Sequence, residues 1–326
     1  MHIHSPARNL ALALIFCVLC LACSNEFDVI QPGLHRHPIV SGRLATPSEI
    51  HSTVAFLDET LEPYCTGTLI APQVVVTAAH CFVEADEETG EIRNVTEAEN
   101  IRVAVNSLNA MNVEEKNIYD VMTVAAHERY PDENVNADGD GLGAEYDIAL
   151  VLLNDAVEGV SPTQVLPWSR IDEISQGTEI IISGYGLSNA SDDDSSGILR
   201  IAETPFQRRS ALEYIAGTAG TPDTCQGDSG GPGYVNIDGT RYLLGASARG
   251  IESTDIACGR GGISTLLPAF DNWLVEHAEG FYDPEGPYYE EGGCQCVVGS
   301  PGPSDLPLLG ILALPWLRRR HRPSPE

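Results

Sequence analysis

The amino-acid sequence predicts an all-β fold, because short runs of β-branched and apolar residues recur along the chain. Gly, Pro, Asn and Asp separate these runs, the clearest of which are 53–57, 65–70, 74–78, 101–105, 148–153, 179–183 and 242–246. Many short strands with turn residues between them are typical of a sandwich or a pair of barrels. The exception is 266–278, where Phe270, Trp273, Leu274 and His277 recur at helical spacing and predict one closing helix.

Composition and charge limit the classes of function. The chain has 326 residues, 43% of them hydrophobic, and a formal net charge of −29. An acidic chain of this kind is repelled by a phosphate backbone, so nucleic acid is excluded as the expected partner. We interpret the negative charge mainly as that of acidic side chains on a solvated surface.

The first 23 residues are predicted to be an export signal. Arg8 precedes an unbroken apolar run at 10–22, which is too short to span a bilayer comfortably. The run ends at Ala22-Cys23, which resembles a bacterial lipoprotein cleavage site with Cys23 as the lipidated residue, although Cys20 stands where Leu or Val is usual. Simple secretion with an incidental Cys23 is the alternative. The Pro- and Gly-containing stretch that follows makes 24–38 a predicted pro-segment.

Two acidic inserts, 84–99 and 132–145, are predicted to be surface loops. In the second insert, Asn136, Asp138 and Asp140 precede Gly141 and faintly resemble a calcium loop. No Glu stands at the closing position, so a solvated loop is the preferred interpretation, and we expect no metal and no cofactor.

The strongest chemical motif is Gln226-Gly227-Asp228-Ser229-Gly230-Gly231-Pro232. Glycines on both sides of Ser229 allow a tight turn that exposes its hydroxyl and lets a substrate carbonyl approach the backbone. The N–H groups of Gly227 and Ser229 can then converge on one point as an oxyanion hole. Ser229 is therefore the candidate nucleophile.

Two further motifs supply a base and an acid. His80 follows an apolar run in Thr77-Ala78-Ala79-His80-Cys81, and an imidazole is the natural general base near neutral pH. Asp147 stands just before the apolar run 148–153, where a carboxylate can accept a hydrogen bond from the second imidazole nitrogen. The three residues together form a candidate catalytic triad.

The order His80, Asp147, Ser229 and the motifs around them resemble the chymotrypsin/trypsin family of serine proteases, over residues 39–278. The resemblance implies two antiparallel β-barrels with the triad in the cleft between them. It also implies a monomeric secreted endopeptidase that acts on proteins or peptides. The implied disulfide bonds are Cys65–Cys81 and Cys225–Cys258. The alternative function is a catalytically inert homologue that serves as a binding module.

The same resemblance indicates specificity. Asp223, six residues before Ser229, corresponds to the acid at the base of the primary specificity pocket, which implies cleavage after Arg or Lys. Gly250 and Gly262 correspond to glycines that keep the pocket open. The pocket wall is either Ala248-Arg249-Gly250, or Ser247 takes the serine position after a one-residue insertion. Arg249 could alter neighbouring subsites or repel basic substrate residues.

Activation is expected to free the amino group of Ile39 and pair it with Asp228, as the resemblance implies. Pro38 precedes Ile39, and trypsin-like activators do not readily cut after proline, so another protease or another cleavage site is required.

The C-terminal region is predicted to be a linker with a cysteine motif, 279–305, and a tail, 306–326. Cys294 and Cys296 precede an apolar stretch that ends in Arg318, Arg319 and Arg320. This arrangement resembles a bacterial surface-sorting signal of the type seen in myxobacteria, and the arginines would act as a cytoplasmic stop. A disordered or weakly anchored tail is the alternative. The expected location is secreted, at the bacterial cell surface or outer membrane.

Overall fold

The structure, a computed structural model, describes residues 39, 42–85, 92–131, 141–143, 145–188, 195–251 and 258–284. All of them belong to the compact unit Met1–Tyr288, and a second unit comprises Tyr289–Glu326. The predicted signal, pro-segment and C-terminal tail therefore lie outside the described residues, and so do Asn136, Asp138 and Asp140.

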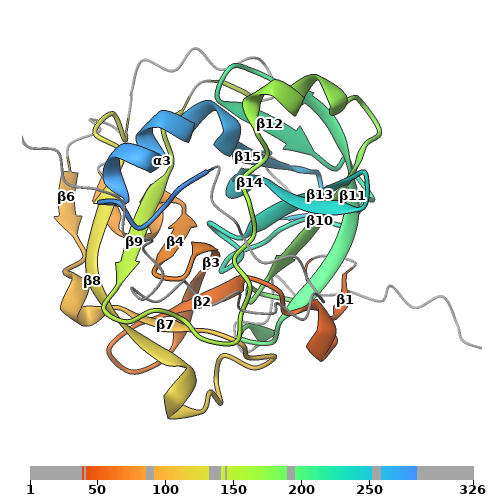
Figure 1. Ribbon diagram of the computed structural model, residues 1–326. Coiled ribbons are helices and arrows are strands. Elements are labelled where there is room, and N and C mark those ends of the chain that lie inside the picture. Colours follow the sequence, from red (N-terminus) through yellow and green to blue (C-terminus); the bar gives the residue numbers. More distant parts are fainter. Residues whose placement is uncertain are drawn as a thin grey trace, which may run out of the picture. The chain divides into compact units, whose positions relative to one another are not determined.

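The first half of the domain is a closed antiparallel barrel (Figure 1). Its strands follow one another around the barrel in the order β2 (Thr53–Leu57), β3 (Pro63–Ala71), β4 (Val74–Thr77), β9 (Ala149–Leu153), β8 (Ile118–Ala126) and β7 (Arg102–Ala104). The residues of β2, β4 and β9 are all buried, because their side chains pack either inside the barrel or against the elements that cover it.

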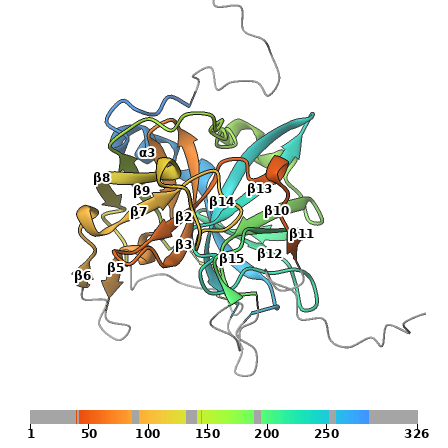
Figure 2. The same ribbon diagram turned by 90° about the horizontal axis from the view of Figure 1, so that it is seen from below.

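The second half is also a barrel, and Figure 2 shows the two halves side by side. Its strands are β11 (Arg200–Arg209), β10 (Glu179–Gly184), β13 (Pro232–Ile237), β14 (Thr240–Gly250), β15 (Gly262–Leu266) and β12 (Glu213–Ala216). Pairing of β12 with β11 closes the barrel, and β1 (Arg43–Leu44) adds to its edge. The prediction of an all-β fold with two antiparallel barrels is confirmed.

The first acidic insert differs from its prediction as a loop. It contains a hairpin of β5 (Val83–Ala85) and β6 (Ile92–Val95). Its exposed second strand and its many charges hide the alternation that usually predicts a strand. Short 3-10 segments connect other elements: η1 (Pro47–Glu49), η2 (Ala79–Cys81), η3 (Ala98–Asn100), η4 (Glu115–Asn117), η5 (Trp168–Glu173) and η7 (Leu267–Phe270).

The closing helix is present but shorter than predicted. Helix α3 spans Asp271–His277, and the residues before it form η7, which contains Pro268, while Leu266 still belongs to β15. Trp273 of α3 stacks on His127, with ring centroids 5.2 Å apart, and so covers the first barrel. Among the helices described, none combines the length and apolar character needed to cross a membrane.

Buried hydroxyl groups join the two barrels. Thr53 of β2 lies 2.7 Å from Ser183 of β10, and the hydroxyl of Tyr234 from β13 lies 3.0 Å from Thr53. Ser52 completes the group, with its hydroxyl 3.1 Å from that of Tyr234. Because each hydroxyl has a partner, the interface buries polar atoms without leaving them unsatisfied. This interface fixes the distance between elements that carry the site.

Candidate active site

His80 lies in η2, immediately after strand β4 of the first barrel. Ala78 and Ala79 are fully buried, which fixes the backbone on the N-terminal side of the imidazole. A disulfide bond between Cys81 and Cys65 ties the other side to β3. The two sulfurs and a nitrogen of His80 lie within 4.8 Å of one another, but sulfurs bonded to each other are not metal ligands.

Asp147 lies two residues before β9 and is 3% exposed. One of its carboxylate oxygens accepts from the backbone N–H of His80 at 3.0 Å, and the other lies 2.7 Å from Nδ1 of the same residue. The hydroxyl of Thr265, on β15 of the second barrel, donates to the Asp147 carbonyl at 2.7 Å. Asp147 is therefore held from both barrels, through its carboxylate and its carbonyl, and the carboxylate fixes the proton of the imidazole on Nδ1.

The charge of Asp147 controls the titration of the imidazole. Burial disfavours the protonated ring and lowers the pKa of His80, but the charge and hydrogen bond of Asp147 outweigh it. The net pKa lies above the ordinary imidazole value. Glu145 raises it further and Arg249 opposes the increase, so both of these side chains act on the same ring.

The loop that carries Ser229 is bonded to the first barrel. The backbone N–H of Thr66 on β3 donates to the Ser229 carbonyl at 2.9 Å, and its hydroxyl donates to the Gly227 carbonyl at 2.8 Å. Cys81, the neighbour of His80, has its sulfur 3.8 Å from the Ser229 carbonyl oxygen. The candidate nucleophile is thereby brought beside the residue that follows the candidate base.

Gly230 is required for this close approach. A Cβ atom at Gly230 would lie 1.9 Å from the hydroxyl of Thr77 and 2.8 Å from the nitrogen of Ala78. No side chain fits at those distances, and the loop would move away from the segment that carries His80. The glycine after the serine thus has a steric explanation that the sequence motif alone did not supply.

Two amides of the loop have no acceptor within the described part of the chain. The N–H groups of Asp228, Gly230 and Gly231 donate to carbonyl oxygens, whereas those of Gly227 and Ser229 do not. These are the two amides that the sequence assigns to an oxyanion hole. The hydroxyl of Ser229 likewise makes no hydrogen bond to a described residue, His80 included, so the candidate nucleophile and both candidate donors have no partner among the described residues.

Asp228 is completely buried beneath this loop. Its oxygens accept from the N–H groups of Gly186 at 2.8 Å and Cys225 at 2.9 Å. Burial raises the pKa of Asp228 to about 7, against the lowering by these two hydrogen bonds; the charge of Asp223 adds to the increase and Arg200 opposes it. No described ammonium or guanidinium group forms an ion pair with this carboxylate.

Ile39 is 1% exposed and belongs to an apolar cluster of the second barrel that includes Ile180 and Ile182. In the full-length chain its nitrogen is part of the peptide bond to Pro38 and carries no charge. Within the described residues it makes no hydrogen bond to Asp228, so the expected pair between these two residues remains a prediction.

Asp223 lies in the second barrel, six residues before Ser229, and is 3% exposed. It accepts hydrogen bonds from four backbone amides: those of Thr224 at 2.8 Å, Gly259 at 2.8 Å, Arg260 at 3.2 Å and Gly261 at 3.1 Å. Burial raises its pKa, and these hydrogen bonds oppose the increase.

Of the two predicted pocket glycines, Gly262 lies against this carboxylate. Gly262 pairs with Gly250 between β14 and β15, and a Cβ at Gly262 would meet the Asp223 carboxylate at 3.2 Å. The disulfide bond Cys225–Cys258 connects the two segments of the site. The hydroxyl of Ser247 donates to that of Thr224, the residue after Asp223, at 3.2 Å. Of the two candidates for the pocket wall, Ser247 is thus the one with a hydroxyl bonded beside Asp223.

Arg249 is not the unpaired cation that could repel basic residues. Its guanidinium forms ion pairs with Glu145 at 2.5 Å and with Glu213 at 2.6 Å. Two carboxylates around one guanidinium leave a net charge of about −1, so the hypothesis of repulsion by Arg249 loses its physical basis. We call Arg249, Glu145 and Glu213 the Arg249 cluster.

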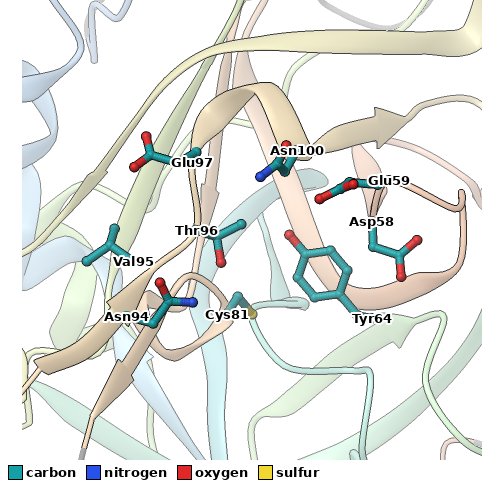
Figure 3. A pocket seen from close by; sticks show the side chains of 9 residues that line it. All are labelled: Asp58, Glu59, Tyr64, Cys81, Asn94, Val95, Thr96, Glu97 and Asn100. Carbon is teal, nitrogen blue, oxygen red and sulfur yellow. The ribbon is translucent and has the colours of Figure 1, made fainter.

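A separate hollow of about 420 Å³ adjoins Cys81 on the first barrel (Figure 3). Tyr64 and Cys81 lie on it together with the β6 hairpin strand, and Asp58, Glu59 and Glu97 give it a negative charge. No motif of the sequence indicates this hollow, since its walls come from three separate segments of the chain.

The comparison with known protein families agrees with this geometry. The family model described as Trypsin matches residues 39–274. The chain belongs to the trypsin family. The match covers the whole two-barrel domain with His80, Asp147 and Ser229, and it ends within helix α3.

Sequence reasoning missed the supporting residues of this trypsin-family site. Thr66, Thr265 and Glu213 stand in ordinary strand sequence, and only the pairing of strands reveals that they bond to the serine loop, to Asp147 and to Arg249. A buried Glu within a strand was the one available signal, because such a charge normally requires a partner.

The pKa values of two histidines near the site should be shifted in opposite directions from the ordinary imidazole value. We expect NMR titration of the imidazole C–H signals to place the pKa of His80 above about 6.5, because Asp147 stabilises the protonated ring. His127, whose pKa is lowered mainly by burial, should lie below that value in the same experiment. Asp147→Asn removes the charge and should lower only the pKa of His80. A pKa of His80 that is unchanged by this substitution would contradict the assignment.

Proposed function

We propose that the protein is an active serine endopeptidase that hydrolyses peptide bonds through an acyl-enzyme. The observation that carries the proposal is the Asp147–His80 hydrogen bond next to a serine loop with two amides free to bind an oxyanion. The pairing positions a base whose other nitrogen, Nε2, can receive the proton of Ser229.

The proposed reaction has two steps. The Ser229 oxygen attacks the substrate carbonyl while Nε2 of His80 takes its proton, and the N–H groups of Gly227 and Ser229 stabilise the negative oxygen. His80 then donates that proton to the leaving amine, which departs and leaves an ester on Ser229. Water, activated by the same imidazole, hydrolyses the ester and releases the acid. Asp147 stabilises the imidazolium in both steps.

Labelling with a fluorophosphonate probe tests this proposal directly. We expect the mature protein to be labelled, and Ser229→Ala to remove the labelling and to lower turnover by a factor on the order of 10^6. Ser48→Ala, at an exposed serine in η1, is the matched control and should change neither result. Labelling that persists in Ser229→Ala would contradict the nucleophile, and a mature wild-type protein without labelling would favour an inert binding homologue.

We further propose cleavage after Arg or Lys. Asp223 is a buried carboxylate that no described cationic side chain neutralises, and backbone amides hold it in a fixed position. A substrate guanidinium or ammonium that reaches it recovers part of the cost of burying this charge, whereas an apolar side chain leaves it unpaired. The site therefore favours a cationic residue before the scissile bond.

Asp223→Ser should lower kcat/KM for Arg and Lys peptides by about 10² to 10³-fold, since removal of one partner of a buried charge pair costs about 2–5 kcal/mol. Peptides with Phe or Ala at that position should be cleaved equally or better. Asp238→Ser removes an exposed aspartate that pairs with Arg170 and serves as the control. A panel of fluorogenic peptides measures the change. Wild-type preference for Phe or Ala would contradict the specificity.

Export and maturation at both ends belong to the same proposal. Pairing with a free Ile39 amino group would supply the positive charge that Asp228 lacks, and it would lower a pKa that burial has raised to about 7. The apolar segment after Arg8 and the arginine-rich tail support removal of residues 1–23 as a signal and surface sorting through the C-terminal region.

N-terminal sequencing and the intact mass of the active protein should reveal maturation at both ends. We expect the active form to begin at Ile39 and to lack an unmodified Glu326, because the amino-terminal charge completes the site and the tail is a processed signal. A lipid mass on Cys23 of the unprocessed form would identify the lipoprotein route. Activity in a form that begins upstream of Ile39 would contradict the switch, and an intact Glu326 on released protein would contradict sorting.

A further inference from the structure

Arg249 connects three separate segments of the chain at the edge of the candidate active site. Its strand, β14, has a register shift between Ser247 and Arg249 where it pairs with β15. The two terminal nitrogens of its guanidinium donate to the two carboxylate oxygens of Glu213 on β12, at 2.6 and 3.1 Å. Glu213 is completely buried, so this bidentate pair is a fixed point in the second barrel.

The same guanidinium reaches the segment that leads to Asp147. It donates to the Gly141 carbonyl at 2.8 Å and to the Glu145 carboxylate at 2.5 Å. Glu213 adds a bond of its own, since it accepts from the Gly143 N–H at 2.7 Å. Three contacts, at Gly141, Gly143 and Glu145, therefore attach this segment to the second barrel within the six residues before the candidate catalytic aspartate.

The opposite side of Asp147 is attached to the same strands. Thr265, which bonds to the Asp147 carbonyl, is the cross-strand partner of Glu213 between β12 and β15. Asp147 thus lies between two anchors on the second barrel while its carboxylate bonds to His80 in the first barrel. The register of β12 and β15 sets the distance between these anchors.

We propose that Arg249 is a positioning residue for the catalytic aspartate: by joining Glu213 to Glu145 and Gly141, it holds Asp147 in register with His80. The inference rests on the proposed serine-protease function. Burying ions is costly, and a paired set of charges is often no more stabilising than apolar residues of the same shape. A geometric role explains why a planar guanidinium, which satisfies several acceptors at once, stands here.

Two substitutions separate geometry from charge. Arg249→Met removes both and should lower kcat by about 10²-fold with little change in KM, because small displacements of catalytic groups have effects of this size. Arg249→Lys keeps the charge but lacks the planar fork whose separate nitrogens bond to Glu213, Glu145 and Gly141 at once, so it should recover less than about a tenth of the lost activity. Full recovery with Lys would show that charge alone matters and would overturn the proposal.

A spectroscopic measurement tests the geometry without turnover. The proton between His80 Nδ1 and Asp147 should give a far-downfield NMR signal in the Ser229→Ala background, and Arg249→Met should broaden or remove it. Arg43→Met breaks an exposed ion pair with Glu49 and is the matched control, with kcat and signal unchanged. A folded Arg249→Met protein with kcat within about threefold of this control and an intact signal would overturn the proposal.

Glu145→Gln keeps the test decisive if Arg249→Met does not fold. Glu145 is partly exposed, so its loss leaves no buried charge unpaired, and Glu213 still holds Arg249. We expect kcat to fall by about tenfold and the downfield signal to broaden; an unchanged kcat and signal would overturn the proposal. If wild-type protein shows neither labelling nor turnover, the proposed function fails, while the downfield signal still reports on the role of Arg249.

Discussion

The contact of the serine loop with strand β3 is the constraint on which the site depends. Ser229 belongs to the second barrel and His80 to the first, so neither barrel contains a complete site. Two hydrogen bonds from Thr66 hold the loop against the first barrel, and the missing Cβ of Gly230 lets it come close enough. Asp147 makes the reverse connection, since its carboxylate bonds to His80 and its carbonyl to Thr265 of the second barrel. The chemistry of the candidate site therefore depends on how the two barrels are placed, because sliding one barrel past the other would separate the Ser229 hydroxyl from the His80 imidazole.

Buried carboxylates with different partners have different roles around this contact. Asp147 has an imidazole partner that becomes positive during the proposed reaction, and it raises the pKa of that ring. Among the described residues, only backbone amides bond to the carboxylates of Asp223 and Asp228, and burial raises the pKa of each. A carboxylate that is held by dipoles but lacks a counter-charge is a place where an incoming cation gains most. For Asp223 the proposed cation comes from the substrate, and for Asp228 from the new amino terminus, so the proposed specificity and the proposed activation share one electrostatic explanation.

The sequence predicted the fold class and the residues of the proposed triad because the relevant signals are local. A strand shows its apolar run over about five residues, and Gly227 to Gly231 show a turn in their own composition. The hairpin in the first acidic insert was missed because its second strand is exposed, so its residues carry no burial pattern. The supporting contacts were missed for another reason. Thr66, Glu213 and Thr265 act through partners that are distant in sequence, and their roles exist only once strand register is known.

The Arg249 cluster shows how one such long-range contact changes an interpretation. In the sequence, Arg249 stands as an isolated cation beside a pocket for cationic residues, which suggests repulsion. In the structure it is enclosed by Glu145 and Glu213, and its charge is more than neutralised. The cost of burying Glu213 is offset only while Arg249 keeps its position, and Arg249 in turn holds the segment before Asp147. The charge that would oppose substrate binding if free is therefore, when paired, available for the positioning role that we propose for it at Asp147.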